Sequence, residues 1–213
     1  MGREFTALFD EWSESYDRTV AGDDVEYREA FAGYDRILEA VAERVSGTVV
    51  EFGVGTGNLT EKLLKRSNKV YGIEPSEGMR REVLKRGLAV EVLDGDFLEF
   101  PELQGPIDAI VSTYAFHHLT DEEKTKAAAL YSGLLAPGGR VVFADTSFAS
   151  AEERQEIEQS ALDAGYLNLY RDLRTEYYTS LEILNKLFTE QGFSVGFTRL
   201  NRYVWLLEAV KLA

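Results

Sequence analysis

The segment Val49-Val50-Glu51-Phe52-Gly53-Val54-Gly55-Thr56-Gly57-Asn58-Leu59-Thr60 joins a mostly apolar run to three closely spaced glycines and then to a sequence with helical character. The apolar run is typical of a strand that is buried on both faces. Glycine accepts positive φ angles and lets a ligand approach the backbone closely. Because ligands of parallel α/β folds bind at the carboxyl ends of the strands, the segment predicts a strand, a binding loop and a helix in that order.

Three kinds of loop can be compared with this glycine spacing. A phosphate-binding P-loop requires Lys and then Ser or Thr after its last glycine, and neither follows Gly57 in that order. The dinucleotide fingerprint G-x-G-x-x-G requires a third glycine where this chain has Asn58 or Thr60. An ordinary turn between a strand and a helix does not require three glycines. What remains is G-x-G-x-G, with the acidic residue Glu51 two positions before Gly53.

Strand-like and helix-like segments alternate around this loop. Strands are expected at 48–52, 69–74, 89–94, 107–114 and 140–145. Helices are expected at 58–67, 76–86 and 121–135. The alternation predicts a parallel sheet with right-handed crossovers. An amphipathic segment after Ser180 and two β-rich segments, 193–200 and 203–211, predict a final helix and an antiparallel hairpin.

Capping and turn residues define the ends of the helix expected at 121–135. Thr120 precedes three acidic residues and is expected to cap the N-terminus of this helix. Pro137-Gly138-Gly139 is expected to stop the helix and to turn into the next strand.

The 213 residues are expected to form a single domain with four parts. These are a helical lid (1–46), a ligand-binding core (47–146), a Tyr- and Arg-rich substrate cap (147–179), and a final helix with the hairpin (180–213). Within the first part, four aromatic residues recur at helical spacing and would dock a helix on the core or form a lid over a ligand. They are Phe5, Phe9, Trp12 and Tyr16.

An acidic residue followed by x-G-x-G-x-G, here Glu51 with Gly53, Gly55 and Gly57, resembles the first motif of the class I S-adenosylmethionine (AdoMet) methyltransferases. AdoMet has no pyrophosphate, so such a loop passes beneath a methionine moiety and a ribose. The resemblance implies a Rossmann-like α/β fold, with a seven-stranded, mostly parallel sheet, a C-terminal antiparallel hairpin and helices on both faces. It also implies an enzyme that uses AdoMet and releases S-adenosyl-L-homocysteine (SAH).

Whole segments are similar to the YrrT-like bacterial methyltransferases. The match is carried by Gly2–Phe5, Glu51–Thr60, Ser112–Glu123 and Val204–Ala209, and it covers most of the chain. That family is associated with sulfur amino-acid recycling, which implies a small metabolite as the methyl acceptor.

Two acidic residues are expected at the ends of the second and third strands. Glu74 could accept charge-assisted hydrogen bonds from both ribose hydroxyls. In similar methyltransferases an acid at the position of Asp96 binds the adenine amino group, and the next residue, here Phe97, packs on the ring. A carboxylate suits that donor and a phenyl ring offers the flat face.

Both histidines of the chain, His117 and His118, follow the fourth expected strand, near the expected position of the methyl group. They are assigned as a general base or as residues that position the acceptor, because an imidazole titrates near neutral pH. Two histidines without Cys or suitably spaced carboxylates do not predict a metal site, so no metal is expected. Tyr114 and Tyr16, the latter similar to a lid residue of related enzymes, complete the expected cofactor site.

The composition restricts the partners and the chemistry. The formal net charge is −14, and a field of this sign repels phosphate backbones and anionic lipid. We therefore expect neither nucleic acid nor a membrane as a partner. The chain has no cysteine, which excludes methylation through a covalent thiol adduct. Its first residues lack the apolar core of a signal peptide, so no signal segment is expected. A cytoplasmic monomer or homodimer that methylates a small molecule by in-line displacement is the favoured hypothesis.

Two alternatives stay open. One is a non-catalytic AdoMet-binding or regulatory module, since the sequence does not identify the position of the nucleophile. The other is an NAD(P)-dependent oxidoreductase, which Asn58 disfavours because the dinucleotide fingerprint has glycine there.

Overall fold

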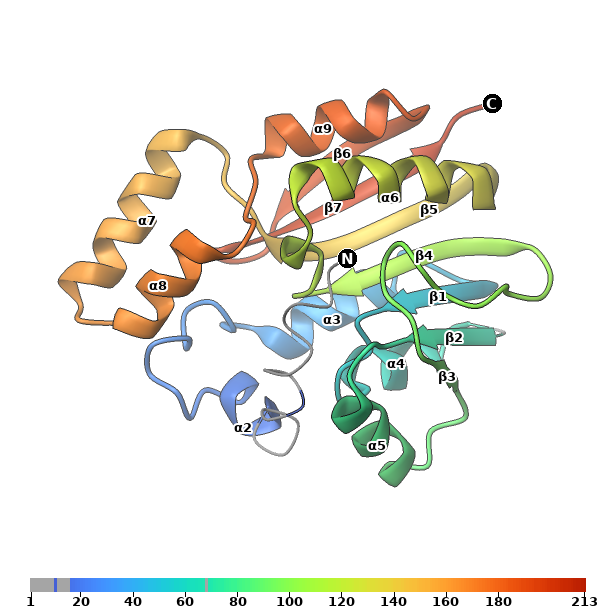
Figure 1. The fold of residues 1–213 in the computed structure, drawn as a ribbon, viewed down its shortest axis with the longest axis horizontal. Helices are drawn as coiled ribbons and strands as arrows, with labels where there is room; N and C mark the ends of the chain where they lie inside the picture. Colours follow the sequence, from blue (N-terminus) through green and yellow to red (C-terminus); the bar gives the residue numbers. More distant parts are fainter. Residues whose placement is uncertain (1–9, 11–15, 68) are drawn as a thin grey trace.

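The computed structural model describes residues 10, 16–67 and 69–213, in which a central sheet carries helices on both faces (Figure 1). The strands are β1 (Thr48–Phe52), β2 (Lys69–Ile73), β3 (Glu91–Leu93), β4 (Ile107–Thr113), β5 (Leu135–Thr146), β6 (Phe193–Arg199) and β7 (Val204–Lys211). The helices of the described residues are α2 (Tyr16–Val20), α3 (Tyr34–Ala42), α4 (Asn58–Leu63), α5 (Glu77–Lys85), the 3₁₀ turn η1 (Phe116–His118), α6 (Asp121–Leu134), α7 (Ala151–Asp163), α8 (Leu167–Thr175) and α9 (Leu181–Thr189).

The seven strands lie in the order β3-β2-β1-β4-β5-β7-β6. Strands β1 to β5 are parallel, whereas β7 runs antiparallel to both β5 and β6. The predicted fold, with its mostly parallel sheet and C-terminal hairpin, is confirmed. The chain progresses outward from β1 to β3 and then returns to β4 on the other side of β1, so the strand order reverses between β1 and β4. The carboxyl ends of these two strands mark the crevice in which such folds bind ligands.

The apolar strands are explained by burial on both faces of the sheet. Because alternate side chains of a strand point to opposite faces, Val49 belongs to a core cluster that also contains residues of α3, α4, α7 and α8, whereas Val50 belongs to a second cluster that contains residues of α6 and α9. Val111 and Ile110 of β4 divide between the same two clusters. Burying one such side chain stabilises the fold by roughly 1.5–3 kcal/mol.

Three element boundaries differ from the predictions. Helix α4 and strand β3 are shorter than expected, and β5 begins at Leu135, directly after α6, rather than at Arg140. Pro137-Gly138-Gly139 therefore does not separate α6 from β5. Instead, the β4–β5 ladder passes from the Ile107–Leu135 pair to the Ala109–Arg140 pair, so the residues between them form an irregularity within the strand, with φ 88° at Gly138.

The N-terminal part, which the sequence predicts to be helical, contains two separate helices among the described residues. Helices α2 and α3 are separated by turns over residues 21–33, and Gly22 and Gly33 have φ angles of 95° and 75°. These left-handed conformations interrupt a helix. Phe5, Phe9 and Trp12 of the predicted aromatic stripe lie outside the described residues. Helices α2, α7 and α8 lie beyond the carboxyl ends of the parallel strands (Figure 1).

Candidate active site

The loop after β1 is shaped by its three glycines. Gly53, Gly55 and Gly57 have φ angles of 68°, 58° and 88°, in the region that side chains with a Cβ disfavour. A Cβ at Gly53 would lie 2.7 Å from the Cβ of Ala115, whereas a Cβ at Gly55 would meet nothing within 4 Å. The loop is thus packed against the β4 side at Gly53 and is open at Gly55.

A cavity of about 670 Å³, counted to its mouth, adjoins this loop. The cavity brings together eight of the predicted site residues: Tyr16, Gly53, Gly55, Glu74, Asp96, Phe97, Tyr114 and His118. Its other lining residues, which the sequence analysis did not assign, are Pro75, Met79, Thr113 and Ala115.

Glu74 connects the loop after β1 with the start of α5. One carboxylate oxygen accepts from the backbone N–H of Gly55 at 2.9 Å, and the other accepts from that of Ser76 at 2.9 Å. Burial raises the pKa of Glu74 to about 7. Since a carboxylate has about four acceptor positions, these two bonds leave capacity for two more donors, as many as a ribose diol offers. The geometry is therefore compatible with the predicted role of Glu74.

Glu51 lies beneath the loop and is not among the residues that line the cavity. Its side chain is buried and accepts a hydrogen bond of 2.6 Å from the hydroxyl of Thr60, at the start of α4. Burial raises the pKa of Glu51 to about 8. Gly57 also lies outside the lining, at the N-terminus of α4. Both residues are placed to shape the loop rather than to touch a ligand in this cavity.

Asp96 and Phe97 form the wall below the end of β3. One oxygen of Asp96 accepts from the backbone N–H groups of Leu98 and Glu99, both at 2.9 Å, which fixes the orientation of the side chain. The Phe97 ring stacks on Phe52 at 5.3 Å and is 7% exposed. The wall thus combines a fixed carboxylate with a rigid aromatic ring.

Tyr114 has φ 53°, the one positive φ outside glycine among the described residues. Strain of this kind costs on the order of 1–3 kcal/mol and persists where the surroundings enforce it. Here the N–H of Tyr114 donates to Ala144 on β5 at 3.0 Å, and its ring packs at 4.9 Å from that of Phe31. The residue is thereby turned out of β4 toward the cavity.

The N-terminal segment is attached to both loops that surround the cavity. Asp17 accepts from the Thr56 hydroxyl at 2.7 Å and from the Asn58 amide at 2.9 Å. Asp10 accepts from the Ser76 hydroxyl at 2.6 Å and from the Gly78 N–H at 2.9 Å. The Asp17 bonds fix the residue next to Tyr16, and Tyr16 lines the cavity.

A second cavity of about 700 Å³ adjoins the first. Tyr16, Tyr114 and His118 line both cavities and form the wall between them. On the far side of this wall, the second cavity is lined by His117 and by residues from α8 and its C-terminal side: Leu169, Asp172, Glu176 and Tyr178. The predicted cap therefore contributes two acids and one tyrosine to this cavity, whereas Arg171 pairs with Asp172 and Arg174 donates to Tyr170.

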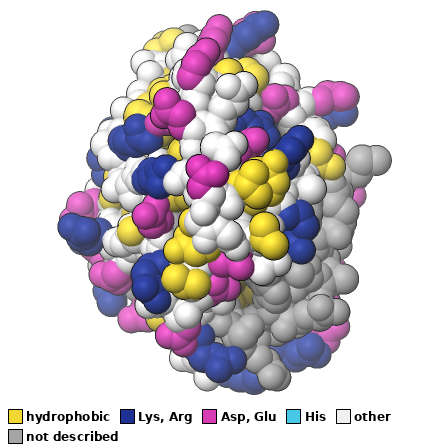
Figure 2. All heavy atoms as spheres, turned by 90° about the vertical axis from the view of Figure 1, so that its left-hand side faces the viewer, with side chains coloured by type: hydrophobic (Ala, Val, Ile, Leu, Met, Phe, Trp, Pro, Cys, Tyr) yellow, Lys and Arg dark blue, Asp and Glu magenta, His cyan; other side chains and the backbone are white. Residues whose placement is uncertain are grey.

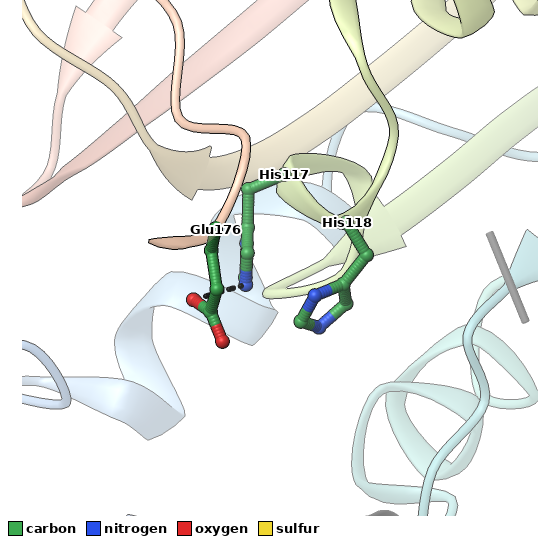
Figure 3. A group of neighbouring side chains, drawn as sticks. All are labelled: His117, His118 and Glu176. Carbon is green, nitrogen blue, oxygen red and sulfur yellow. Dashed lines mark ion pairs between the residues drawn. The ribbon is translucent and has the colours of Figure 1, made fainter. Parts of the chain in front are cut away.

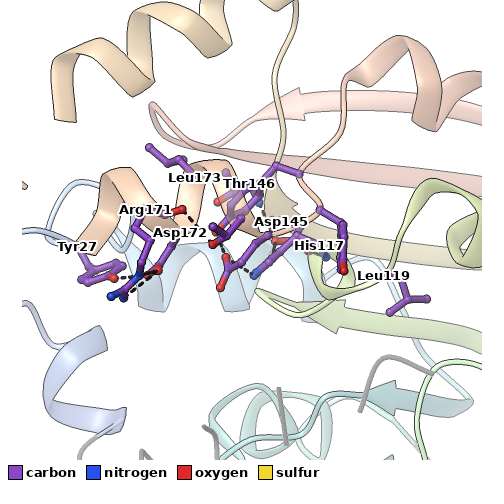
Figure 4. A network of polar contacts seen from close by, with 12 residues as sticks. Tyr27, His117, Leu119, Asp145, Thr146, Arg171, Asp172 and Leu173 are labelled. Carbon is purple, nitrogen blue, oxygen red and sulfur yellow. Dashed lines mark hydrogen bonds and ion pairs between the residues drawn. The ribbon is translucent and has the colours of Figure 1, made fainter. Parts of the chain in front are cut away.

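His117 belongs to a polar network that connects β5, η1 and the segment after α8 (Figure 4). Its Nδ1 lies 2.6 Å from one Asp145 oxygen, its backbone N–H donates to the other at 2.8 Å, and its Nε2 lies 3.5 Å from Glu176. Burial opposes the charged form, but the Asp145 and Glu176 carboxylates outweigh it and raise the pKa of His117. Burial and the charge of His117 lower the pKa of His118, so His118 stays neutral.

Asp145 and Glu176 were not predicted as site residues. Asp145 could have been found, because it lies at the carboxyl end of a parallel strand, at the same edge as Glu74 and Asp96. Glu176 gives no such signal, since it follows α8 within an insertion and reaches His117 only through the tertiary fold.

The match to known proteins covers both sequence and fold. Residues 49–139 match a family model described as a methyltransferase domain. An uncharacterized methyltransferase of Geobacillus kaustophilus is 56% identical over 213 residues, which cover 99% of this chain and 99% of that protein. The chain belongs to this methyltransferase family. The predicted enzyme class, an AdoMet-dependent methyltransferase, and the predicted cofactor are confirmed.

Solved structures share the fold at low sequence identity. The DhpI–SAH complex has a TM-score of 0.72 at 18% identity, with 100% of this chain and 97% of that chain covered. The [4+2]-cyclase SpnF has a TM-score of 0.74 at 14% identity, with the same coverage. A protein named as a cyclase thus has this fold too, so the fold by itself does not define the reaction. In the described part of the methyltransferase, none of the helices is long and apolar enough to span a bilayer.

Proposed function

We propose that this methyltransferase transfers the methyl group of AdoMet to a small molecule that binds in the second cavity. The observation that carries the proposal is the wall shared by the two cavities, formed by Tyr16, Tyr114 and His118. AdoMet bound in the first cavity would direct its sulfonium methyl through this wall, and an acceptor in the second cavity would approach from the opposite side.

The first cavity has a suitable group for each part of the cofactor. Glu74 would accept the ribose hydroxyls, and the open backbone at Gly55 would pass beneath the methionine moiety. Asp96 and Phe97 would hold adenine between a carboxylate and a rigid ring. Glu51 and Gly57 would maintain the loop from below.

The reaction requires orientation more than acid catalysis, because the leaving group is a neutral thioether. Holding acceptor, methyl carbon and sulfur in line is worth up to about 7–11 kcal/mol. Tyr16 and Tyr114 offer aromatic faces to the sulfonium, an attraction of roughly 0.5–2 kcal/mol. His117 and His118 would position the acceptor at the far side of the methyl group.

A small-molecule acceptor agrees with the position of the second cavity and with the negative net charge of the chain. Figure 2 shows Lys and Arg interspersed with Asp and Glu on the face that was at the left of Figure 1, without a continuous basic stripe. Such a face, on a chain whose formal net charge is −14, does not favour a nucleic acid partner. We further propose a cytoplasmic enzyme that acts as a monomer or a homodimer.

The proposal is tested by incubating the protein with AdoMet and a panel of small metabolites and measuring SAH. We expect SAH to form with one class of acceptor, and His118→Ala to reduce turnover while AdoMet still binds. Calorimetry with AdoMet, SAH and NAD accompanies the assay. Binding of AdoMet without turnover on any acceptor would indicate a regulatory module, and binding of NAD alone would indicate an oxidoreductase; either result contradicts the proposal.

A further inference from the structure

Three potential metal ligands meet in the second cavity. His117, His118 and Glu176 each offer one ligand atom, and these atoms all lie within 4.8 Å of one another. Figure 3 shows the two imidazole rings, both from η1, and the Glu176 carboxylate, from the segment after α8, extending into the same space. Both histidines of the chain take part. Two histidines and one glutamate form a known ligand set for catalytic zinc, which keeps a fourth position open for water or substrate.

Asp145 orients the first of these ligands. An ionised carboxylate can only accept, so the 2.6 Å contact with Asp145 places a proton on Nδ1 of His117 and leaves Nε2 as the donor atom for a metal. That Nε2 lies 3.5 Å from a Glu176 oxygen. A tetrahedral zinc ion with bonds of about 2.0–2.1 Å holds its ligand atoms roughly 3.3–3.4 Å apart. A carboxylate that fixes the second nitrogen of a ligating histidine is the usual outer partner in zinc sites.

The two segments that supply the ligands are held together by other bonds. The backbone N–H of Tyr177 donates to the carbonyl of His117 at 3.1 Å. The buried ammonium of Lys124 donates to the carbonyl of Leu119 and, at 2.6 Å, to that of Tyr177. Tyr177, the residue after Glu176, is therefore held near η1 through both its N–H and its carbonyl. Because this frame is built by bonds that do not involve the ligand atoms, the cluster is prepared before any ion binds.

We propose that His117, His118 and Glu176 bind one divalent transition-metal ion, with Zn²⁺ as the best match, and that its open position faces the second cavity. Imidazole nitrogens suit zinc, whereas Mg²⁺ prefers an octahedron of oxygen ligands. This proposal departs from the expectation of no metal, which rested on the lack of Cys or of suitably spaced carboxylates near the histidine pair in the sequence. Glu176 supplies that carboxylate from a distant part of the chain.

The test is a calorimetric titration of tag-free, chelator-treated protein with Zn²⁺, together with metal analysis after dialysis. We expect one Zn²⁺ per chain and no competition from Mg²⁺. Glu176→Gln and His118→Gln remove a ligand and should each weaken binding by more than about 100-fold. Asp145→Asn removes the orienting partner and should weaken it about 10–100-fold.

The matched control is Glu182→Gln, an exposed residue of α9 that should bind Zn²⁺ like the wild type. The AdoMet-induced thermal shift of each variant shows whether it is folded, and the wild-type titration stands even if a variant fails to fold. The proposal is overturned if the wild type does not bind Zn²⁺ stoichiometrically, or if folded Glu176→Gln retains affinity within about 10-fold of the wild type. Neither result depends on whether an acceptor for the methyl group is found.

Discussion

Glu74 is a buried carboxylate with two backbone partners, and the proposed function gives it two more donors from the cofactor. Ligand binding to the folded state alone adds about 2.7 kcal/mol of stability at 100 times the dissociation constant. For a chain of this size, that is a rise in melting temperature of about 5–11 °C. Glu74→Ala should lose most of the rise caused by AdoMet, whereas the exposed Glu77→Ala should keep it. Differential scanning fluorimetry distinguishes these outcomes, and an unchanged shift in Glu74→Ala would refute the ribose assignment.

Glu51 makes stability depend on pH. Its pKa is raised from 4.5 to about 8 by burial, so the folded protein keeps a proton that the unfolded chain releases between these values. The stabilisation is complete below about pH 4.5 and is lost as the pH rises through about 8, with a slope of at most about 1.4 kcal/mol per pH unit. Glu51→Gln has no such proton and can still accept from Thr60.

The pH prediction is measured by urea unfolding between about pH 7 and 8, above the pKa of Glu74. The free energy of unfolding of Glu51→Gln should fall less steeply than that of the wild type over this interval. Parallel slopes for the two proteins would show that Glu51 is already ionised in the folded state.

At the scale of elements, a pair of variants can separate a binding role of the loop between β1 and α4 from the general cost of replacing a glycine that has a positive φ angle. Gly55 and Gly87 have φ angles of 58° and 63°, and an added Cβ meets nothing within 4 Å at either position. Alanine should therefore destabilise the protein by a similar amount at both, about 1–2 kcal/mol. Only Gly55 lines the first cavity, so only Gly55→Ala should also weaken AdoMet binding. Equal AdoMet affinities for the two variants in calorimetry would contradict the assignment of the loop.

The capping box at α6 is another element-scale feature. The Thr120 hydroxyl accepts from the Glu123 N–H, and the Glu123 carboxylate accepts from the Thr120 N–H. Thr120→Ala should cost about 1 kcal/mol of stability. Thr125→Ala, in the same helix, should cost less because alanine has the higher helix propensity. Urea unfolding measures the loss of stability in both variants, and equal losses would show that the capping box does not stabilise α6.

The elements differ in how far the sequence predicts them. Strands such as β1 and β4 are readable because two buried faces require nearly continuous apolar residues. The predicted boundary of β5 was wrong because Pro137-Gly138-Gly139 has the composition of a turn, yet it lies inside β5 as an irregularity between two paired positions of the β4–β5 ladder. Local composition cannot distinguish these two cases, since the difference depends on the neighbouring strand.

For the whole molecule, the two cavities also differ in how far local sequence predicts them. The first cavity is formed largely by residues at the ends of successive strands, so Glu74, Asp96 and Tyr114 could be identified from the strand pattern. The second cavity requires the segment after α8 to approach η1, and its residue Glu176 lies far from His117 in the sequence. The proposed cofactor cavity of this methyltransferase is therefore encoded locally, whereas the proposed acceptor cavity depends on long-range packing.

The shared wall between the cavities is the central claim, and a crystal structure with SAH bound tests it most directly. We predict the adenosine against Asp96 and Phe97, the ribose on Glu74, and the sulfur beside Tyr16, Tyr114 and His118 with its missing methyl directed into the second cavity. SAH bound outside the first cavity, or with its sulfur turned away from that wall, would contradict the account.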